Sequence, residues 1–133
     1  LYEWDPVRNV INKKKDFTWG TGYGNFGSLT LYNGKLYGLQ TYGSLSGTLF
    51  EWDPETNIYT RKFNFVDSKK ANNPRNSLAV LNGKMYGIAE GLGGRVYFGN
   101  GVIFEWDPAT NIYTDKYIFR DQQFDLSPVS ELT

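Results

Sequence analysis

Hydrophobic and polar residues alternate in short runs along the whole chain, and Gly, Asn, Asp and Pro residues that favour turns separate the runs. Alternation with a period of two places successive side chains on opposite faces of a β-strand. The pattern therefore predicts strands over residues 1–4, 10–17, 28–32, 35–39, 48–52, 58–65, 77–81, 84–88, 102–106 and 112–119, with a last one over 129–133. No helix is expected, so the predicted fold class is all-β.

Two phrases recur within these strands. The first is Leu1-Tyr-Glu-Trp-Asp-Pro6, which returns almost unchanged at residues 49–54 and 103–108. The second is Ser28-Leu-Thr-Leu-Tyr-Asn-Gly-Lys-Leu-Tyr-Gly38, which returns at residues 77–87. Short strands that repeat with a period of roughly 40–55 residues are typical of propellers and solenoid arrays. The chain is therefore a tandem array.

The repeats divide the chain into units of four strands. Residues 1–17 are predicted to form the last two strands of a partial unit, residues 18–65 and 66–119 two full units, and residues 120–133 the start of a further one. In each full unit an Asn-Gly pair separates the first two strands, which is the strongest short-range signal for a two-residue hairpin. An Asp-Pro turn joins the last two strands, and its Asp side chain is suited to accept hydrogen bonds from nearby backbone amides. Such reversals make an antiparallel meander.

Bulky apolar residues occupy both faces of the third and fourth strands of a unit. Phe50 and Trp52 lie on one side of the third strand and Leu49 on the other, while Tyr59 and Phe63 belong to the fourth. A sheet that is apolar on both faces must be covered on both, and meanders stacked face to face around an axis achieve this. We therefore predict a β-propeller fragment of four-stranded antiparallel meander blades, with two full blades and partial blades at both ends.

The repeated motifs resemble a known family. Leu-Tyr-Asn-Gly-Lys-Leu-Tyr-Gly, a glycine-rich loop and then Phe-Glu-Trp-Asp-Pro-x-Thr-Asn-x-Tyr are similar to the kelch-like propeller repeats, in particular the GloVer-type tandem repeats of secreted and surface proteins in Bacteroidetes. The resemblance covers essentially the whole chain. It implies an extracellular or cell-surface location and a non-catalytic binding or adhesive role, and it supplies no catalytic residues.

Composition narrows the chemistry. The 14 basic and 14 acidic side chains balance, so no net field favours nucleic acid or an anionic membrane. Cys and His are absent, which removes disulfides, thiolate nucleophiles, His-based triads and Cys/His zinc sites. No apolar run approaches the ~20 residues of a membrane span. We predict no enzyme activity, no cofactor and no metal site, and a protein or glycan as the partner.

The Glu-Trp-Asp-Pro phrases have two interpretations. One is a repeated cation or sugar site, which would use Asp5, Asp53 and Asp107 together with Trp4, Trp52 and Trp106. The other is that the Asp residues cap turns and the Trp residues pack between blades. We prefer the second, because residues repeated in every unit of an array usually serve the folding of the unit. For the same reason Trp52 is expected to be buried, and the unrepeated Trp19 to be more exposed.

A ligand is expected at the variable connections. Successive connections of a meander alternate between the two ends of the sheet, so the repeated turns share one end. The other end collects the connections that vary in length and content, which are residues 18–27, 40–47, 66–76, 89–101 and 120–128. These loops carry residue types that are enriched in binding hot spots. The ligand-binding candidates are Trp19, Tyr23, Tyr42, Arg95, Tyr97 and Phe98.

Two other functions are compatible with the sequence. One is a purely structural propeller segment whose loop aromatics pack only against their own loops. The other is a carboxylate-based glycan hydrolase, which requires two carboxyl groups about 5–10 Å apart. Its loop candidates are Asp67, Glu90, Asp121 and Asp125. Because the open faces of a partial ring are apolar, we also expect the chain to be part of a longer one or to self-associate.

Overall fold

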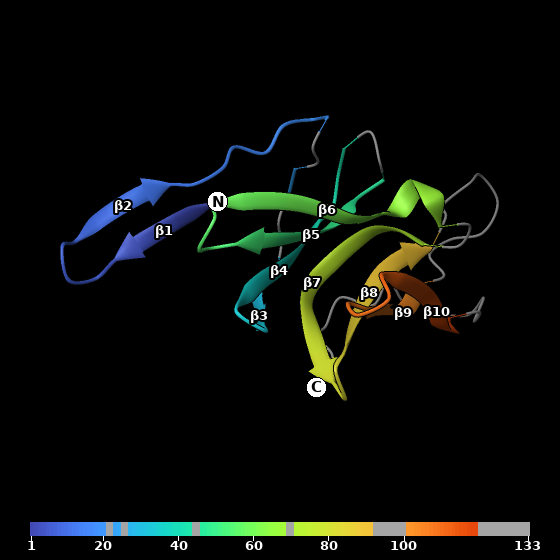
Figure 1. Cartoon of the computed structure of the whole chain (residues 1–133). Coiled ribbons are helices and arrows are strands. Elements are labelled where there is room, and N and C mark those ends of the chain that lie inside the picture. The colour runs from blue at the N-terminus through green and yellow to red at the C-terminus, as the bar shows by residue number, and fades with distance from the viewer. Residues whose placement is uncertain (21–22, 25–26, 44–45, 69–70, 92–100, 120–133) are drawn as a thin grey trace.

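A computed structural model describes residues 1–20, 23–24, 27–43, 46–68, 71–91 and 101–119, and its strands form three antiparallel sheets (Figure 1). A separate hairpin consists of β1 (Tyr2–Asp5) and β2 (Val10–Lys13). The first four-stranded sheet contains β3 (Thr30–Tyr32), β4 (Lys35–Gln40), β5 (Thr48–Asp53) and β6 (Ile58–Asn64). A short 3-10 turn, η1 (Phe65–Asp67), leads to the second, which contains β7 (Ala71–Leu81), β8 (Lys84–Gly91), β9 (Val102–Asp107) and β10 (Ile112–Ile118).

Each four-stranded sheet is a meander, since the strands pair in their sequence order. The all-β class and the two antiparallel meanders are therefore confirmed. Within the described residues no sheet closes on itself. The strand predicted over 129–133 lies outside those residues, as does the whole of 120–133. None of the described residues belong to a helix long and apolar enough to cross a membrane.

The repeated turns have the predicted geometry. Both residues of each Asn-Gly pair have positive φ, 48° and 73° at Asn33 and Gly34 and 51° and 77° at Asn82 and Gly83. Oδ1 of Asp53 accepts hydrogen bonds from the second and third backbone amides that follow it, at 2.9 and 3.2 Å. In the other two Asp-Pro turns, Oδ1 of Asp5 and Oδ1 of Asp107 likewise each accept hydrogen bonds from the second and third backbone amides that follow. The Asp residues therefore cap turns, as preferred from the sequence.

The two four-stranded sheets pack against each other through one hydrophobic core. The first sheet contributes Tyr37, Leu39 and Leu49, and the second contributes Phe104 and Trp106, all of them buried. Strand β7 runs beside β3 and β4 (Figure 1). Side-chain hydroxyls fix this contact, because Oγ1 of Thr30 and Thr41 each donate a 2.8 Å hydrogen bond to a carbonyl of β7.

The four tryptophans differ sharply in exposure. Trp52 and Trp106 are 3% and 1% exposed, whereas Trp19 is 64% exposed, and both expectations for Trp52 and Trp19 are confirmed. Trp4 is 61% exposed, so the prediction that every repeated Trp packs between blades is wrong for this residue. Trp4 lies in the β1–β2 hairpin, which projects away from the two larger sheets (Figure 1). The same phrase therefore has a buried Trp only where a full sheet surrounds it.

The largest differences from the predicted strand boundaries are at the start of β7 and the end of β2. Strand β7 begins at Ala71, although residues 66–76 were expected to be a connection. Pairing with β8 continues through them because Asn73 and Asn76 adopt positive φ, 44° and 66°, where the register shifts. Strand β2 ends at Lys13 and does not reach Phe17, whose ring instead covers the first sheet 5.5 Å from the Phe50 ring.

Candidate functional site

Three of the predicted ligand-binding residues lie side by side at the variable end of the first sheet. The Trp19 ring is 5.4 Å from the Tyr23 ring, and Tyr23 is 5.7 Å from Tyr42, measured between ring centroids. The backbones of Tyr23 and Tyr42 form an isolated antiparallel bridge, with 2.9 Å N–H···O bonds in both directions. This bridge holds the loop before β3 against the connection between β4 and β5, so the three rings form a continuous row.

An ion pair of the second unit extends this row. Arg75 of β7 donates from Nη2 to the Tyr42 hydroxyl at 3.5 Å and from Nε to Oε1 of Glu90 at 2.7 Å. The other carboxylate oxygen of Glu90 accepts a 3.0 Å bond from Asn73 Nδ2. The Glu90 carboxylate thus holds the guanidinium beside Tyr42. We call Trp19, Tyr23, Tyr42, Arg75 and Glu90 the aromatic-arginine surface.

Backbone contacts between the units set the geometry of this surface. The amide of Asn73 donates a 2.8 Å hydrogen bond to the Ser46 carbonyl, and the amide of Thr41 donates a 2.9 Å bond to the Gly24 carbonyl. Asn73 lies at the first register shift of β7, where its positive φ bends the strand. The irregular part of β7, which the sequence pattern did not predict, therefore connects the loops of the first unit to those of the second.

The surface combines exposed rings with partly buried charges. Trp19 and Tyr23 are 64% and 40% exposed, while the Arg75 and Glu90 side chains are 31% and 25% exposed. Aromatic and Arg side chains held in fixed positions are typical of binding hot spots, because they bury large areas with little loss of conformational entropy. This arrangement is suited to binding a ligand that offers flat apolar groups beside polar ones.

Part of the predicted site cannot be placed. Arg95, Tyr97 and Phe98 lie outside the described residues. The sequence reasoning missed Arg75 because it falls in a segment interpreted as a linker between units. A usable signal was present in Pro74-Arg75-Asn76, because Asn is enriched at positive φ and bulges are common at sheet edges and beside active sites.

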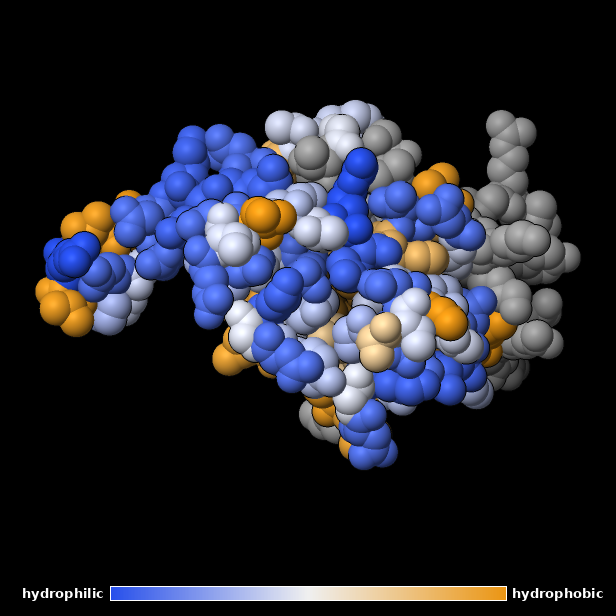
Figure 2. All heavy atoms as spheres, in the orientation of Figure 1, coloured by the Kyte–Doolittle hydropathy of each residue, from blue (hydrophilic) through white to orange (hydrophobic). Residues whose placement is uncertain are grey.

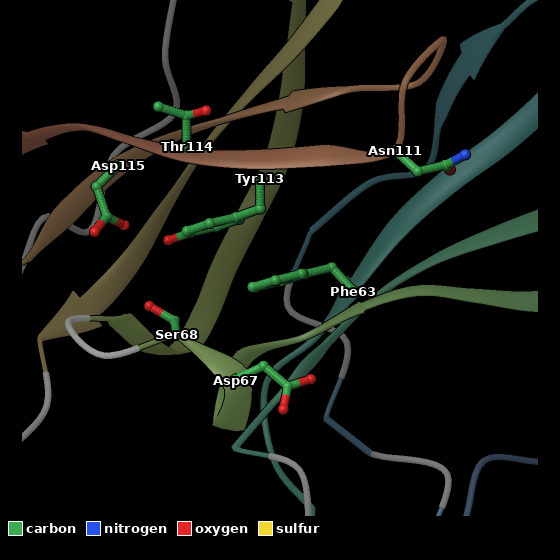
Figure 3. Close-up of a pocket in the computed structure, with 7 residues that line it drawn as sticks. All are labelled: Phe63, Asp67, Ser68, Asn111, Tyr113, Thr114 and Asp115. Carbon is green, nitrogen blue, oxygen red and sulfur yellow. The ribbon is translucent and has the colours of Figure 1, made fainter.

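A second candidate is a hollow of about 640 Å³ between β6, η1 and β10 (Figure 3). Two of its lining residues are Phe63 and Tyr113, whose rings stack with centroids 4.2 Å apart and planes 3° apart. Burial raises the pKa of Tyr113, and the neighbouring Asp115 carboxylate raises it further, so this phenol stays protonated. Because the two rings cover each other, a ligand would meet mainly their edges. The remaining lining residues are Asp67, Ser68, Asn111, Thr114 and Asp115.

Two of the four carboxylates named for a hydrolase belong to the described residues, and their surroundings differ. Asp67 lines the hollow, whereas both oxygens of Glu90 accept hydrogen bonds at the aromatic-arginine surface. Asp121 and Asp125 lie outside the described residues. In the part of the chain that the structure describes, no group of three or more carboxylates is placed to hold a metal ion.

The structure also explains the Glu of the repeated Glu-Trp-Asp-Pro phrase, which sequence reasoning left without a role. In the second unit, Glu105 of β9 accepts hydrogen bonds from Lys84 Nζ at 2.9 Å and from the Tyr86 hydroxyl at 2.7 Å, both from β8. Lys116 of β10 lies 3.2 Å away on the other side. The bonds from Lys84 and Tyr86 lower the pKa of Glu105 from 4.5 to about 2. We call this arrangement the glutamate cluster.

The first unit contains the same cluster around Glu51. Tyr37 donates at 2.6 Å, Lys35 at 3.2 Å, and Lys62 lies at 3.5 Å. Burial by itself would raise the pKa of Glu51, but the bonds from Tyr37 and Lys35 outweigh burial and lower it. The glutamate cluster joins three neighbouring strands of each sheet and is therefore part of the fold and not of the ligand site.

The fourth strand of each sheet has a bulge at the Lys of the glutamate cluster. Opposite β5, the register shifts so that Lys62 has no direct partner in the ladder, and Lys116 is skipped in the same way opposite β9. Each Lys lies two residues after the Thr that faces the glutamate, Thr60 or Thr114, so strand alternation places its side chain on the glutamate side of the sheet. The bulge also places Phe63 and Tyr59 on different faces, since Phe63 contacts Trp106 while Tyr59 stacks on Phe50.

Comparison of the chain with protein-family models and with curated protein sequences finds no match.

Proposed function

We propose that this chain is a segment of a kelch-like β-propeller, of the GloVer type, that acts as a non-catalytic binding module at the cell surface or outside the cell. Support for the propeller comes from two four-stranded meanders of the same design that pack face to face through a shared core. A third hairpin repeats the last two strands of that design. Face-to-face packing of successive meanders is how blades are arranged in a propeller.

The aromatic-arginine surface is the ligand site in this proposal, and the row formed by Trp19, Tyr23 and Tyr42 is the observation that carries it. The row joins loops of the first unit to Arg75 of the second, so the site depends on correct packing of the two units. None of these residues recurs at the equivalent position of the other unit. Residues that are not needed in every unit are available for a specific function.

The ligand that fits this surface best is a glycan. Exposed, neighbouring aromatic rings offer apolar platforms for the flat faces of sugar rings, and the Arg75–Glu90 pair offers a donor fork and an acceptor for hydroxyl groups. The hydrolase alternative is not favoured by this geometry, because Arg75 and Asn73 already occupy both oxygens of Glu90.

A glycan array tests this function. The chain should bind one glycan class, and Trp19→Ala or Tyr23→Ala should weaken that binding about tenfold or more, as expected for a hot-spot residue. Tyr117→Ala is the matched control, because Tyr117 is an exposed aromatic on the distant strand β10. Shortening residues 92–100 is a second arm, which tests the predicted contribution of Arg95, Tyr97 and Phe98.

Three outcomes would count against the proposal. Glycan binding that survives Trp19→Ala combined with Tyr23→Ala would move the site elsewhere. Binding to a protein ligand that these variants abolish would keep the site but replace the glycan. Turnover of a bound polysaccharide would show an enzyme and overturn the non-catalytic role.

A further inference from the structure

The second and third strands of each full unit are complementary residue by residue. In the first sheet, Tyr37 lies opposite Glu51, Leu36 opposite Trp52 and Gly38 opposite Phe50. The second sheet repeats this register, with Tyr86 opposite Glu105, Met85 opposite Trp106 and Gly87 opposite Phe104. The pattern Lys-x-Tyr-Gly in the second strand therefore matches the pattern Phe-Glu-Trp in the third.

Each position of this match has a physical reason. The Lys and Tyr side chains supply the positive charge and the hydroxyl that stabilise the Glu carboxylate in the glutamate cluster. The Gly leaves room for the aromatic ring opposite, because a Cβ on Gly38 would lie 2.6 Å from Cζ of Phe50 and one on Gly87 would lie 2.4 Å from Cζ of Phe104. A side chain at this position is therefore excluded by the neighbouring strand.

Strand β1 has nearly the same sequence as β5 and β9, but it has the equivalent contacts along one edge only. Glu3 lies opposite Asn12 of β2, and the Lys14 Nζ lies 2.7 Å from its carboxylate, as Lys62 and Lys116 lie beside Glu51 and Glu105. Among the described residues, β1 pairs with β2 alone. The edge that β5 and β9 use to bind the Lys-x-Tyr-Gly strand is therefore unpaired in β1.

The side chains that would face the missing strand are exposed. Tyr2 and Trp4 are 66% and 61% exposed, although their counterparts Phe50 and Trp52 are 0% and 3% exposed. The hairpin projects from the body of the molecule, and hydrophobic side chains gather at its end (Figure 2). These include Val7, Val10 and Ile11, all exposed. The hairpin thus presents an unpaired strand edge beside apolar surface, which is a template for strand addition.

We propose that the free edge of β1 is a binding site for a Lys-x-Tyr-Gly strand of another repeat unit, delivered as an Asn-Gly hairpin like residues 28–40 or 77–90. The strand binds antiparallel to β1, with its Tyr opposite Glu3, its apolar residue x opposite Trp4 and its Gly opposite Tyr2. Its Lys and Tyr complete a third glutamate cluster around Glu3. Edge-to-edge pairing of two β1 strands does not fit as well, because β1 contains no Lys to place beside Glu3.

A synthetic peptide with the sequence of residues 77–90 tests this site on the full chain. We expect saturable binding with one peptide per chain, and because the peptide contains no Trp, a blue shift of the protein emission that Trp4→Phe abolishes. A peptide carrying Lys84→Gln together with Tyr86→Phe should bind at least tenfold more weakly. A peptide carrying Gly87→Val should not bind, since its side chain would collide with Tyr2. In the protein, Glu3→Gln should weaken binding of the parent peptide by a similar factor. Glu55→Gln is the control and should leave that binding unchanged.

A second experiment detects the same pairing even if the free peptide binds weakly. The peptide sequence is fused ahead of Leu1 through a flexible Gly/Ser linker, which raises its effective concentration to the millimolar range. We expect Trp4 to become protected from acrylamide quenching and the protection to be lost when the fused strand carries the Lys84→Gln and Tyr86→Phe changes.

Each of three results would overturn the inference. Equal affinity of the parent and doubly substituted peptides would show that the glutamate cluster does not form. A Trp4 that stays fully quenchable in the fusion would show that the edge is not covered. Self-association of the chain through β1 that the peptide does not compete with would assign the edge to a second copy of β1.

Discussion

The Tyr37 hydroxyl donates a 2.6 Å hydrogen bond to Oε2 of Glu51 across two neighbouring strands, and Tyr86 and Glu105 form the same bond at 2.7 Å. This relationship links the two phrases that repeat along the chain, since the Tyr belongs to Asn-Gly-Lys-x-Tyr-Gly and the Glu to Glu-Trp-Asp-Pro. The two phrases are thus the two halves of one buried polar cluster.

We expect Tyr37→Phe to lower the free energy of unfolding by about 1.5–3 kcal/mol, the usual value of a hydrogen bond to a charged group. The substitution removes only the hydroxyl, so packing of the ring is retained. Urea denaturation measures the effect. Tyr117→Phe removes a hydroxyl from an exposed ring and should change stability little. Equal effects of the two substitutions would show that the bond to Glu51 contributes nothing.

Glu105 should make stability depend on pH in the acid range. Bonds from Lys84 and Tyr86 hold its pKa at about 2 in the folded chain, against 4.5 ordinarily. A lowered pKa means that the stabilisation is fully present above about pH 4.5 and is lost as pH falls towards 2. Glu105→Gln should therefore be less stable than wild type at pH 7, and the difference should shrink at low pH.

Chemical denaturation of both proteins at several pH values between 2 and 7 measures this difference. Glu55→Gln, which alters an exposed carboxylate of the turn after β5, is the control. A stability difference between wild type and Glu105→Gln that stays constant over the whole range would contradict the assignment.

Gly34→Ala should lower the free energy of unfolding by about 1–2 kcal/mol, because φ is 73° at this position and a Cβ is strained in the left-handed region. A Cβ at Gly34 would meet no other atom within 4 Å, so backbone strain is the only cost. Gly20→Ala is a matched control, since its Cβ would also meet nothing and its φ lies outside that region. Thermal or urea unfolding that ranks the two variants the other way round would refute the turn assignment.

Gly87→Ala should also destabilise, by about 1–3 kcal/mol, but through overpacking. The new Cβ would lie 2.4 Å from Cζ of Phe104, which is fully buried and has little room to move. Combining Gly87→Ala with Phe104→Leu should cost less than the sum of the two single changes, because the smaller side chain relieves the collision. Strict additivity of the three unfolding free energies would show that the ring is not the cause.

Much of the architecture was determined by local features of the sequence. The Asn-Gly pairs and the Asp-Pro turns specify reversals by their own φ values and side-chain hydrogen bonds, so the turns and the two meanders were predictable. Repetition likewise separated the buried Trp52 from the exposed Trp19. Such properties need only the residue and its neighbours in sequence, because turn conformation and strand alternation are set within a few residues.

Tertiary structure decided everything that depends on which segments meet. Trp4 and Trp106 occur in nearly the same phrase, yet one is 61% and the other 1% exposed, because only β9 has a strand on each side. Arg75 contacts Tyr42, which lies 33 residues earlier in the sequence. Arg75 belongs to the bulged part of β7, which the sequence pattern predicted to be a linker between units. The alternation of a strand determines which side chains share a face. Which other segment covers that face, or pairs with the strand edge, depends on contacts between residues far apart in the sequence. For this reason the glutamate cluster and the contact of Arg75 with Tyr42 emerged only from the folded chain.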